Sequence, residues 1–97
     1  MAVPKSLDGA RVLFTTPIDD RHHHTGKTRH HKHGELQLAA QGLAICHYEA
    51  EIDGGFYLFG CDADWKVVTD TWHETVDAAK RQAAFEYDGV DSTWRSH

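Results

Sequence analysis

The sequence predicts one small α+β domain over residues 1–97: an antiparallel four-stranded meander (β-β-β-β-α) with a single C-terminal helix packed on one face of the sheet. Two observations predict this class. Residues 11–69 alternate runs of β-branched and aromatic residues with glycine, proline and aspartate, which is typical of strands joined by hairpins. Residues 75–88 carry the apolar period of a helix. A chain of this length forms one domain with a modest core.

The N-terminal part of the chain supplies the first two strands. Residues 1–9 are polar, and we expect them to be frayed. Residues 11–16 form the first strand, which Pro17 ends or places on an edge. Residues 35–50 form a long second strand with a bulge at Gly42, although the run Ala39-Ala40-Gln41 is also compatible with a helical turn.

A hairpin around Asp53 and Gly54 sets the predicted register, because Asp-Gly is a preferred pair for a two-residue turn. On one face of the sheet, this register pairs Cys46 with Cys61, Tyr48 with Phe59 and Ala50 with Tyr57. This face is apolar, so we expect the helix to cover it. Phe56 and Leu58 then project from the second face, which has no predicted cover.

The last strand and the helix follow a turn at residues 62–65. Residues 66–69 form the fourth strand, and Thr75 is expected to cap the helix, although Thr71 with Glu74 offers a competing capping box. Trp72 is expected to pack under the helix at this corner, and Gly89 to follow its C-terminus, leaving a tail at 89–97. The apolar stripe of the helix consists of Val76, Ala79, Ala83 and Tyr87.

Composition restricts the classes of protein to which the chain could belong. No apolar run approaches the length of a membrane-spanning helix, and the first residues lack the apolar stretch of a signal peptide. We therefore expect a cytoplasmic protein without a membrane segment. Two cysteines, Cys46 and Cys61, fit a reducing compartment, and we expect free thiols there.

A long basic loop rich in histidine, residues 19–34, is the most unusual feature of the sequence. It has a net charge of +2, whereas the whole chain carries −5. Imidazoles could bind zinc or nickel, and the cations could bind an anion, but no fixed ligand spacing is present. The negative net charge argues against a nucleic-acid partner. The candidate residues for metal or anion binding within 21–33 are His22, His23, His24, His30, His31, His33, Arg21, Lys27, Arg29 and Lys32.

The sequence identifies no activity. Asp70, His73 and Cys61 offer catalytic groups, but nothing in the sequence fixes a base beside a nucleophile. No resident cofactor is implied. We therefore expect a small non-enzymatic protein-interaction module that binds another protein or forms a homodimer through the second sheet face or an edge strand. Its predicted interaction surface consists of Phe56, Leu58, Phe85 and Trp94.

Overall fold

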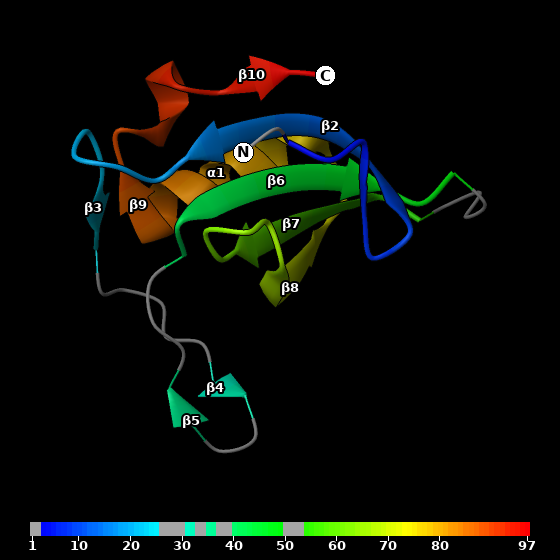
Figure 1. The fold of residues 1–97 in the computed structure, drawn as a ribbon. Helices are drawn as coiled ribbons and strands as arrows, with labels where there is room; N and C mark the ends of the chain where they lie inside the picture. The colour runs from blue at the N-terminus through cyan, green and yellow to red at the C-terminus, as the bar shows by residue number, and fades with distance from the viewer. Residues whose placement is uncertain (1–2, 26–30, 33–34, 37–39, 50–53) are drawn as a thin grey trace.

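A computed structural model describes residues 3–25, 31–32, 35–36, 40–49 and 54–97 of the chain. Its centre is one antiparallel sheet in the order β1-β2-β6-β7-β8, with β10 also paired to β2. The sheet is strongly curled, and helix α1 (Val76–Glu86) lies across one side of it (Figure 1). The strands are β1 (Ser6–Leu7), β2 (Ala10–Pro17), β6 (Gly42–His47), β7 (Phe56–Cys61), β8 (Val67–His73) and β10 (Arg95–Ser96).

The predicted α+β class with one helix is confirmed, but the four-stranded meander is wrong because both terminal segments add a strand. Segment 1–9, which we expected to be frayed, contributes β1, and the tail contributes β10. Asp8 and Gly9 both have positive φ, as a two-residue hairpin turn requires. This turn pairs Leu7 with Ala10 and buries Leu7. Both additions give partners to backbone groups of β2 that would otherwise be unpaired at an edge.

The register between β6 and β7 differs from the prediction. Cys46 pairs with Tyr57, not with Cys61, and Gly42 is the partner of Cys61. The connection is therefore longer than the predicted Asp53-Gly54 turn, whose Asp53 lies outside the described residues. The shift is an even number of positions, so each side chain remains on its predicted face of the sheet.

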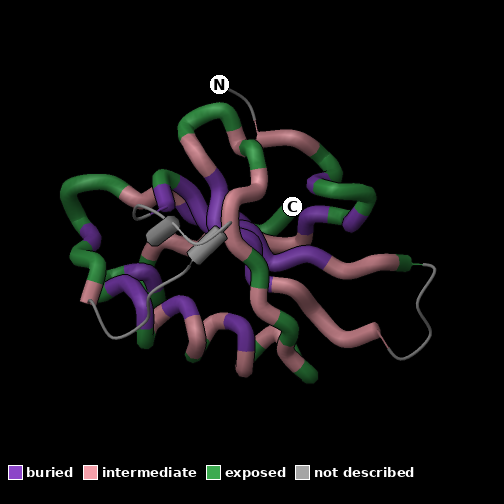
Figure 2. Tube along the Cα trace, turned by 90° about the horizontal axis from the view of Figure 1, so that it is seen from below, coloured by how far each residue is buried: buried purple, intermediate pink, exposed green. Residues whose placement is uncertain are grey.

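The two faces of the sheet carry two separate cores. Buried residues lie along the central strands and on the helix (Figure 2). The helix packs on the face that carries Phe56 and Leu58, whereas the sequence predicts that it packs on the face of Cys46 and Cys61. The predicted placement of the helix is therefore wrong. The opposite face has small side chains at its centre, and Leu7, Val3 and Trp65 pack against it. The buried residues on the helix side are Ala40, Leu43, Ile45, Leu58, Ala79, Ala83, Tyr87 and Val90. Those on the opposite side are Leu7, Ala10, Val12, Ala44, Cys46, Phe59 and Cys61.

The helix begins as the sequence predicts. The Thr75 hydroxyl accepts a hydrogen bond from Ala78 N at 3.0 Å, whereas Thr71 of the competing capping box belongs to β8. The helix ends at Glu86, earlier than the predicted stop at Gly89. The chain then enters the two-residue strand β9 (Tyr87–Asp88) and a 3-10 turn (Val90–Ser92).

Three short strands remain in and around the histidine-rich loop. Strand β3 (His23–His24) pairs with β9, and β4 (His31–Lys32) pairs with β5 (Glu35–Leu36). Ala40 and Gln41 are not helical, and the third residue of that alternative, Ala39, lies outside the described residues. Among the described residues, no helix is long and apolar enough to cross a membrane.

Candidate functional site

The outer edge of β8 is the first candidate site. Strand β8 is the last strand of the sheet and pairs with β7 alone within the described part of the chain. Its first three side chains are half-buried, and from Asp70 to His73 exposed and half-buried side chains alternate. An edge strand of seven residues with unpaired backbone groups is a template for pairing with another extended segment.

Trp72 is the most exposed large apolar side chain of this edge. It is 52% exposed, so our prediction that it packs under the helix is wrong. The side chain points to the other face because Trp72 pairs with Tyr57, whose ring stacks on Phe59. Its indole Nε1 donates a hydrogen bond to Gly54 O. The ring also lies close above Gly55, where a Cβ atom would stand 2.7 Å from Trp72 Cζ2.

The fixed orientation of Trp72 follows from these two neighbours. Gly55 has a φ of 65°, a conformation that favours glycine, and its lack of a side chain admits the indole. An exposed tryptophan held in one orientation loses little conformational freedom on binding, which is typical of side chains that dominate protein interfaces.

The surroundings of β8 are acidic. Residues 62–77 contain five carboxylates and one lysine. Asp70 is exposed and lies two residues from Trp72, so both side chains leave the same face of the strand. None of these carboxylates makes an ion pair within the described part of the chain. The edge therefore combines open backbone groups, an exposed aromatic ring and unpaired negative charge.

The four residues of the predicted interaction surface do not form one exposed patch. Leu58 is 4% exposed and lies beneath the helix, with Phe56 and Trp94 packed against the same core. Trp94 Nε1 is buried without a hydrogen-bond partner among the described residues. Phe85 is 46% exposed on the helix.

The histidine-rich loop is tied to the C-terminal segment by the buried imidazole of His22. His22 Nδ1 accepts a hydrogen bond from Asp19 N at 3.1 Å, and its Nε2 lies 2.9 Å from Thr93 Oγ1. Thr93 Oγ1 in turn lies 2.6 Å from Thr16 Oγ1 on β2. Both ring nitrogens of His22 are engaged in this way, so neither is available as a metal ligand in this arrangement.

The other loop residues are distributed unevenly. His23 and His24 are exposed on β3, and His24 also contacts the ring of Tyr87. Arg21 forms a bidentate pair with Asp19, and this pair holds the pKa of the Asp19 carboxyl well below its usual range. No group of three or more potential metal ligands occurs among the described residues. The backbones of His31 and Lys32 form β4, and Lys27, Arg29, His30 and His33 lie outside the described residues. Metal or anion binding by this loop stays a prediction.

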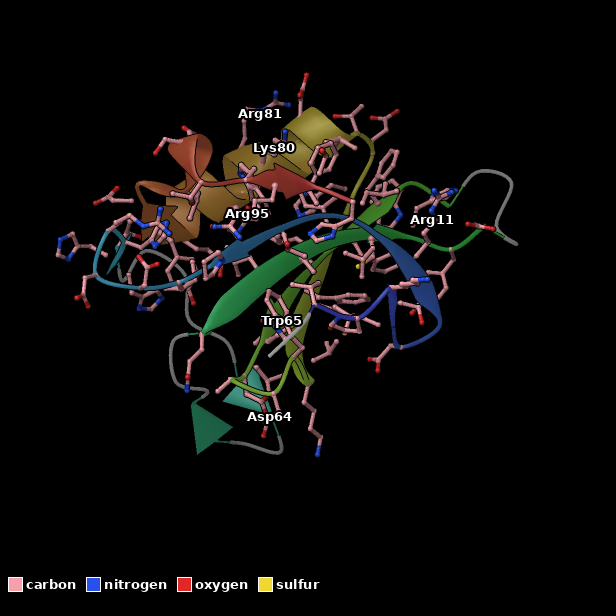
Figure 3. All side chains as sticks on the ribbon, turned by 45° about the horizontal axis from the view of Figure 1, so that its top comes forward. Arg11, Asp64, Trp65, Lys80, Arg81 and Arg95 are labelled. Carbon is pink, nitrogen blue, oxygen red and sulfur yellow. The ribbon has the colours of Figure 1, made fainter. Side chains whose placement is uncertain are left out.

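A cleft of about 400 Å³ lies on the sheet face opposite the helix. We call it the β10 cleft, because Arg95 and His97 form one of its walls. Arg95 extends from β10 over β2, and Trp65 lies on the far side of β6 (Figure 3). Its further lining residues are Val3, Thr15, Pro17, Ile18, Gln41, Asp62 and Ala63.

The two cysteines are free and buried, as predicted. Burial raises the pKa of the Cys46 and Cys61 thiols to about 12, so both are protonated and poorly nucleophilic at neutral pH. Neither provides an activated nucleophile.

Sequence reasoning named an edge strand as a possible interaction surface but ended the fourth strand at Thr69, so it missed Trp72 as part of that edge. Residues 67–72 are rich in β-branched and aromatic residues, a composition that favours a strand longer than the predicted 66–69. Comparison of the chain with models of protein families, with curated proteins and with solved structures finds no match.

Proposed function

We propose that this protein is a small interaction module that binds a basic, extended segment of another protein along the outer edge of β8. The observation that carries this proposal is the position of exposed Trp72 beside exposed Asp70 on an edge strand without an outer neighbour among the described residues. Backbone hydrogen bonds would bind any extended segment, and Trp72 and Asp70 would supply the preference for a basic one.

The chemistry of the edge favours a cationic partner. A strand added beside β8 places one of its side chains opposite Asp70 and another, two residues away, near Trp72. A lysine or arginine at the first position would pair with the carboxylate. One at the second would lie over the indole face, a contact worth roughly 0.5–2 kcal/mol. The surrounding acidic residues would add long-range attraction and accelerate association.

A second copy of the chain fits this edge less well. Two-fold pairing of β8 about its central residue would place Asp70 opposite its own symmetry mate, and like charges directly opposite each other are destabilising. The predicted homodimer is therefore the alternative that an experiment must separate from binding to a different protein.

The test uses a fluorescein-labelled heptapeptide that alternates lysine or arginine with valine, and a matched peptide with glutamate at the basic positions. Fluorescence anisotropy should detect binding of the basic peptide alone. Both Trp72→Ala and Asp70→Lys should weaken this binding by about tenfold or more, because each removes one of the two specific contacts.

Two variants of exposed residues elsewhere serve as controls. Phe85→Ala removes an exposed aromatic ring from the helix, and Asp91→Lys reverses a charge on the 3-10 turn. Both should bind the peptide as the unaltered protein does. Equal binding of the two peptides, or unchanged binding by Trp72→Ala, would contradict the proposal. A dimer in light scattering that Asp70→Asn strengthens, because the like charges opposite each other are removed, would assign the edge to a second copy.

A further inference from the structure

The β10 cleft is separate from the β8 edge and carries chemistry of its own. Arg95 and Thr15 are direct partners across β10 and β2, so their side chains leave the same face of the sheet. Thr15 Oγ1 lies 2.5 Å from His97 Nε2, and His97 N donates to Leu13 O at 2.8 Å. These contacts fix the strand that presents Arg95.

Arg95 brings an unpaired positive charge to this wall. It is exposed and makes no ion pair or side-chain hydrogen bond within the described part of the chain. A guanidinium held on a short strand at the rim of a cleft is suited to bind a carboxylate through two parallel hydrogen bonds.

The opposite wall brings a negative charge. Asp62 Oδ1 accepts hydrogen bonds from Asp64 N and Lys66 N, each at 2.9 Å, and so fixes the turn between β7 and β8. The second carboxylate oxygen, Oδ2, has no hydrogen-bond partner among the described residues. Asp62 can therefore keep its structural role and still accept a hydrogen bond from a ligand in the cleft.

Trp65 forms the apolar part of this wall in an unusual backbone conformation. Its φ is 60°, in the left-handed region that a bulky side chain rarely adopts. Its ring lies so close above Gly42 that a Cβ atom there would stand 2.8 Å from Trp65 Cη2. Backbone strain of this kind is found preferentially at functional sites, and here it places an indole beside the two charged groups.

The spacing of the charges limits the size of the ligand. Arg95 is in register with Thr15, Ala44 and Phe59, and Asp62 lies three residues beyond Phe59. Three strand separations of about 4.8 Å and a rise of about 10 Å along the strand give about 17 Å between the two backbones in a flat sheet. The curl of this sheet shortens that distance, and the two side chains occupy part of it. The remaining gap suits a molecule whose opposite charges are about 7 Å apart, the length of two extended residues.

We propose that the β10 cleft binds a zwitterionic peptide of dipeptide size, with its carboxylate on Arg95, its ammonium group on Asp62 and an apolar side chain against Trp65. A volume of about 400 Å³ is within the range of small-molecule sites. Asp62 would repel a simple anion and could not bind it. A zwitterion can bind Arg95 through its carboxylate and Asp62 through its ammonium group.

Isothermal titration calorimetry of the full chain at neutral pH tests this proposal with leucyl-leucine, its N-acetyl form and its C-terminal amide. Leucyl-leucine should bind, and blocking either end should weaken binding about tenfold, because each block removes one charge-assisted hydrogen bond. Arg95→Gln should bind leucyl-leucine and the amide equally. Asp62→Asn retains the oxygen that caps the turn and should bind leucyl-leucine and the acetylated form equally.

Arg81→Gln, which changes an exposed arginine on the helix, should leave all three affinities unchanged. The proposal is overturned if leucyl-leucine does not bind at millimolar concentration, or if the blocked peptides bind as well as the free one. It is also overturned if Arg95→Gln keeps the preference for a free carboxylate. Binding of inorganic phosphate with the same affinity as leucyl-leucine would identify a simple anion site instead and would overturn the proposal.

Discussion

The two outer edges of the central sheet, β2 and β8, differ in whether other segments of the chain cover them. The outer edge of β2 is covered by β1 near one end and by β10 near the other. Side chains lock this edge further, since Thr16 hydrogen-bonds to Thr93 in the C-terminal segment. The outer edge of β8 has no such cover among the described residues.

This difference indicates where a partner can bind. Proteins usually protect long edge strands by covering them or by placing charges on them. At β2 the chain uses its own terminal segments as cover, while at β8 it presents one charge, Asp70, and an exposed ring, Trp72. The charge disfavours pairing of the edge with itself but favours a partner of opposite charge.

The largest expected loss of stability comes from a substitution on β7, the strand that pairs with β8. Leu58→Ala should lower the free energy of unfolding by about 2–5 kcal/mol, because it leaves a cavity beneath the helix. Val68→Ala, on the half-buried edge strand, should cost less than about 1 kcal/mol. Urea denaturation measures both. Equal losses would mean that the β8 edge is as well packed as the core, which would weaken the contrast between the two edges.

A smaller effect should separate the two edges directly. Thr16→Val removes the hydrogen bond that the Thr16 hydroxyl donates to Pro17 O and its hydrogen bond with the Thr93 hydroxyl, so it should cost about 1–2 kcal/mol. Thr71→Val, its counterpart on β8, loses one partly buried hydrogen bond with His73 and should cost about 0.5 kcal/mol. A larger loss from Thr71→Val than from Thr16→Val would reverse our assignment of the more strongly fixed edge.

The smallest effect is a pH dependence at the end of β8. Burial lowers the pKa of His73 below its ordinary value of 6.5, with Glu86 opposing the shift. The unfolded chain then binds this proton more readily than the folded chain. The contribution of His73 to stability is therefore complete above pH 6.5 and is lost as the pH falls below it.

Replacement of the half-buried His73 should reduce this loss. In His73→Gln, the decrease in Tm between about pH 8 and about pH 5.5 should be smaller than in the unaltered protein. His23→Gln, at an exposed position on β3, should leave the decrease unchanged. The reverse ranking of the two variants would show that the folded chain does not disfavour protonation at His73.

Features that depend on local physics could be predicted from the sequence. The Thr75 cap and the buried positions Ala79 and Ala83 follow from helical period and capping chemistry. The two-residue period of strands predicts which side chains of β6 and β7 share a face of the sheet. This prediction is correct although the predicted register is wrong, because the shift is an even number of residues.

Features that depend on distant segments could not be predicted in the same way. Two of the three Asp-Gly dipeptides, at residues 8–9 and 53–54, precede a strand, and their local preference for a turn is the same. The first forms the predicted kind of turn because Leu7 is buried by pairing with β2. Local preference alone does not distinguish the two occurrences.

The candidate site shows the same limit. The sequence predicts a fourth strand over residues 66–69, and Thr71 with Glu74 matches a capping box that would compete with Thr75. Pairing of Thr71 with Leu58 and of Trp72 with Tyr57 continues β8 instead. Which edge remains open depends on β10, a segment that joins β2 from the far end of the chain.

The central claim, that the β8 edge is the surface that receives a partner strand, is tested most directly by amide hydrogen exchange. The outward-facing amides of β8 should exchange rapidly in the free protein and slowly when the basic heptapeptide is bound. Exchange along β2, whose edge is covered, should be slow in both states. Protection by the peptide that appears elsewhere and leaves β8 unchanged would contradict the account.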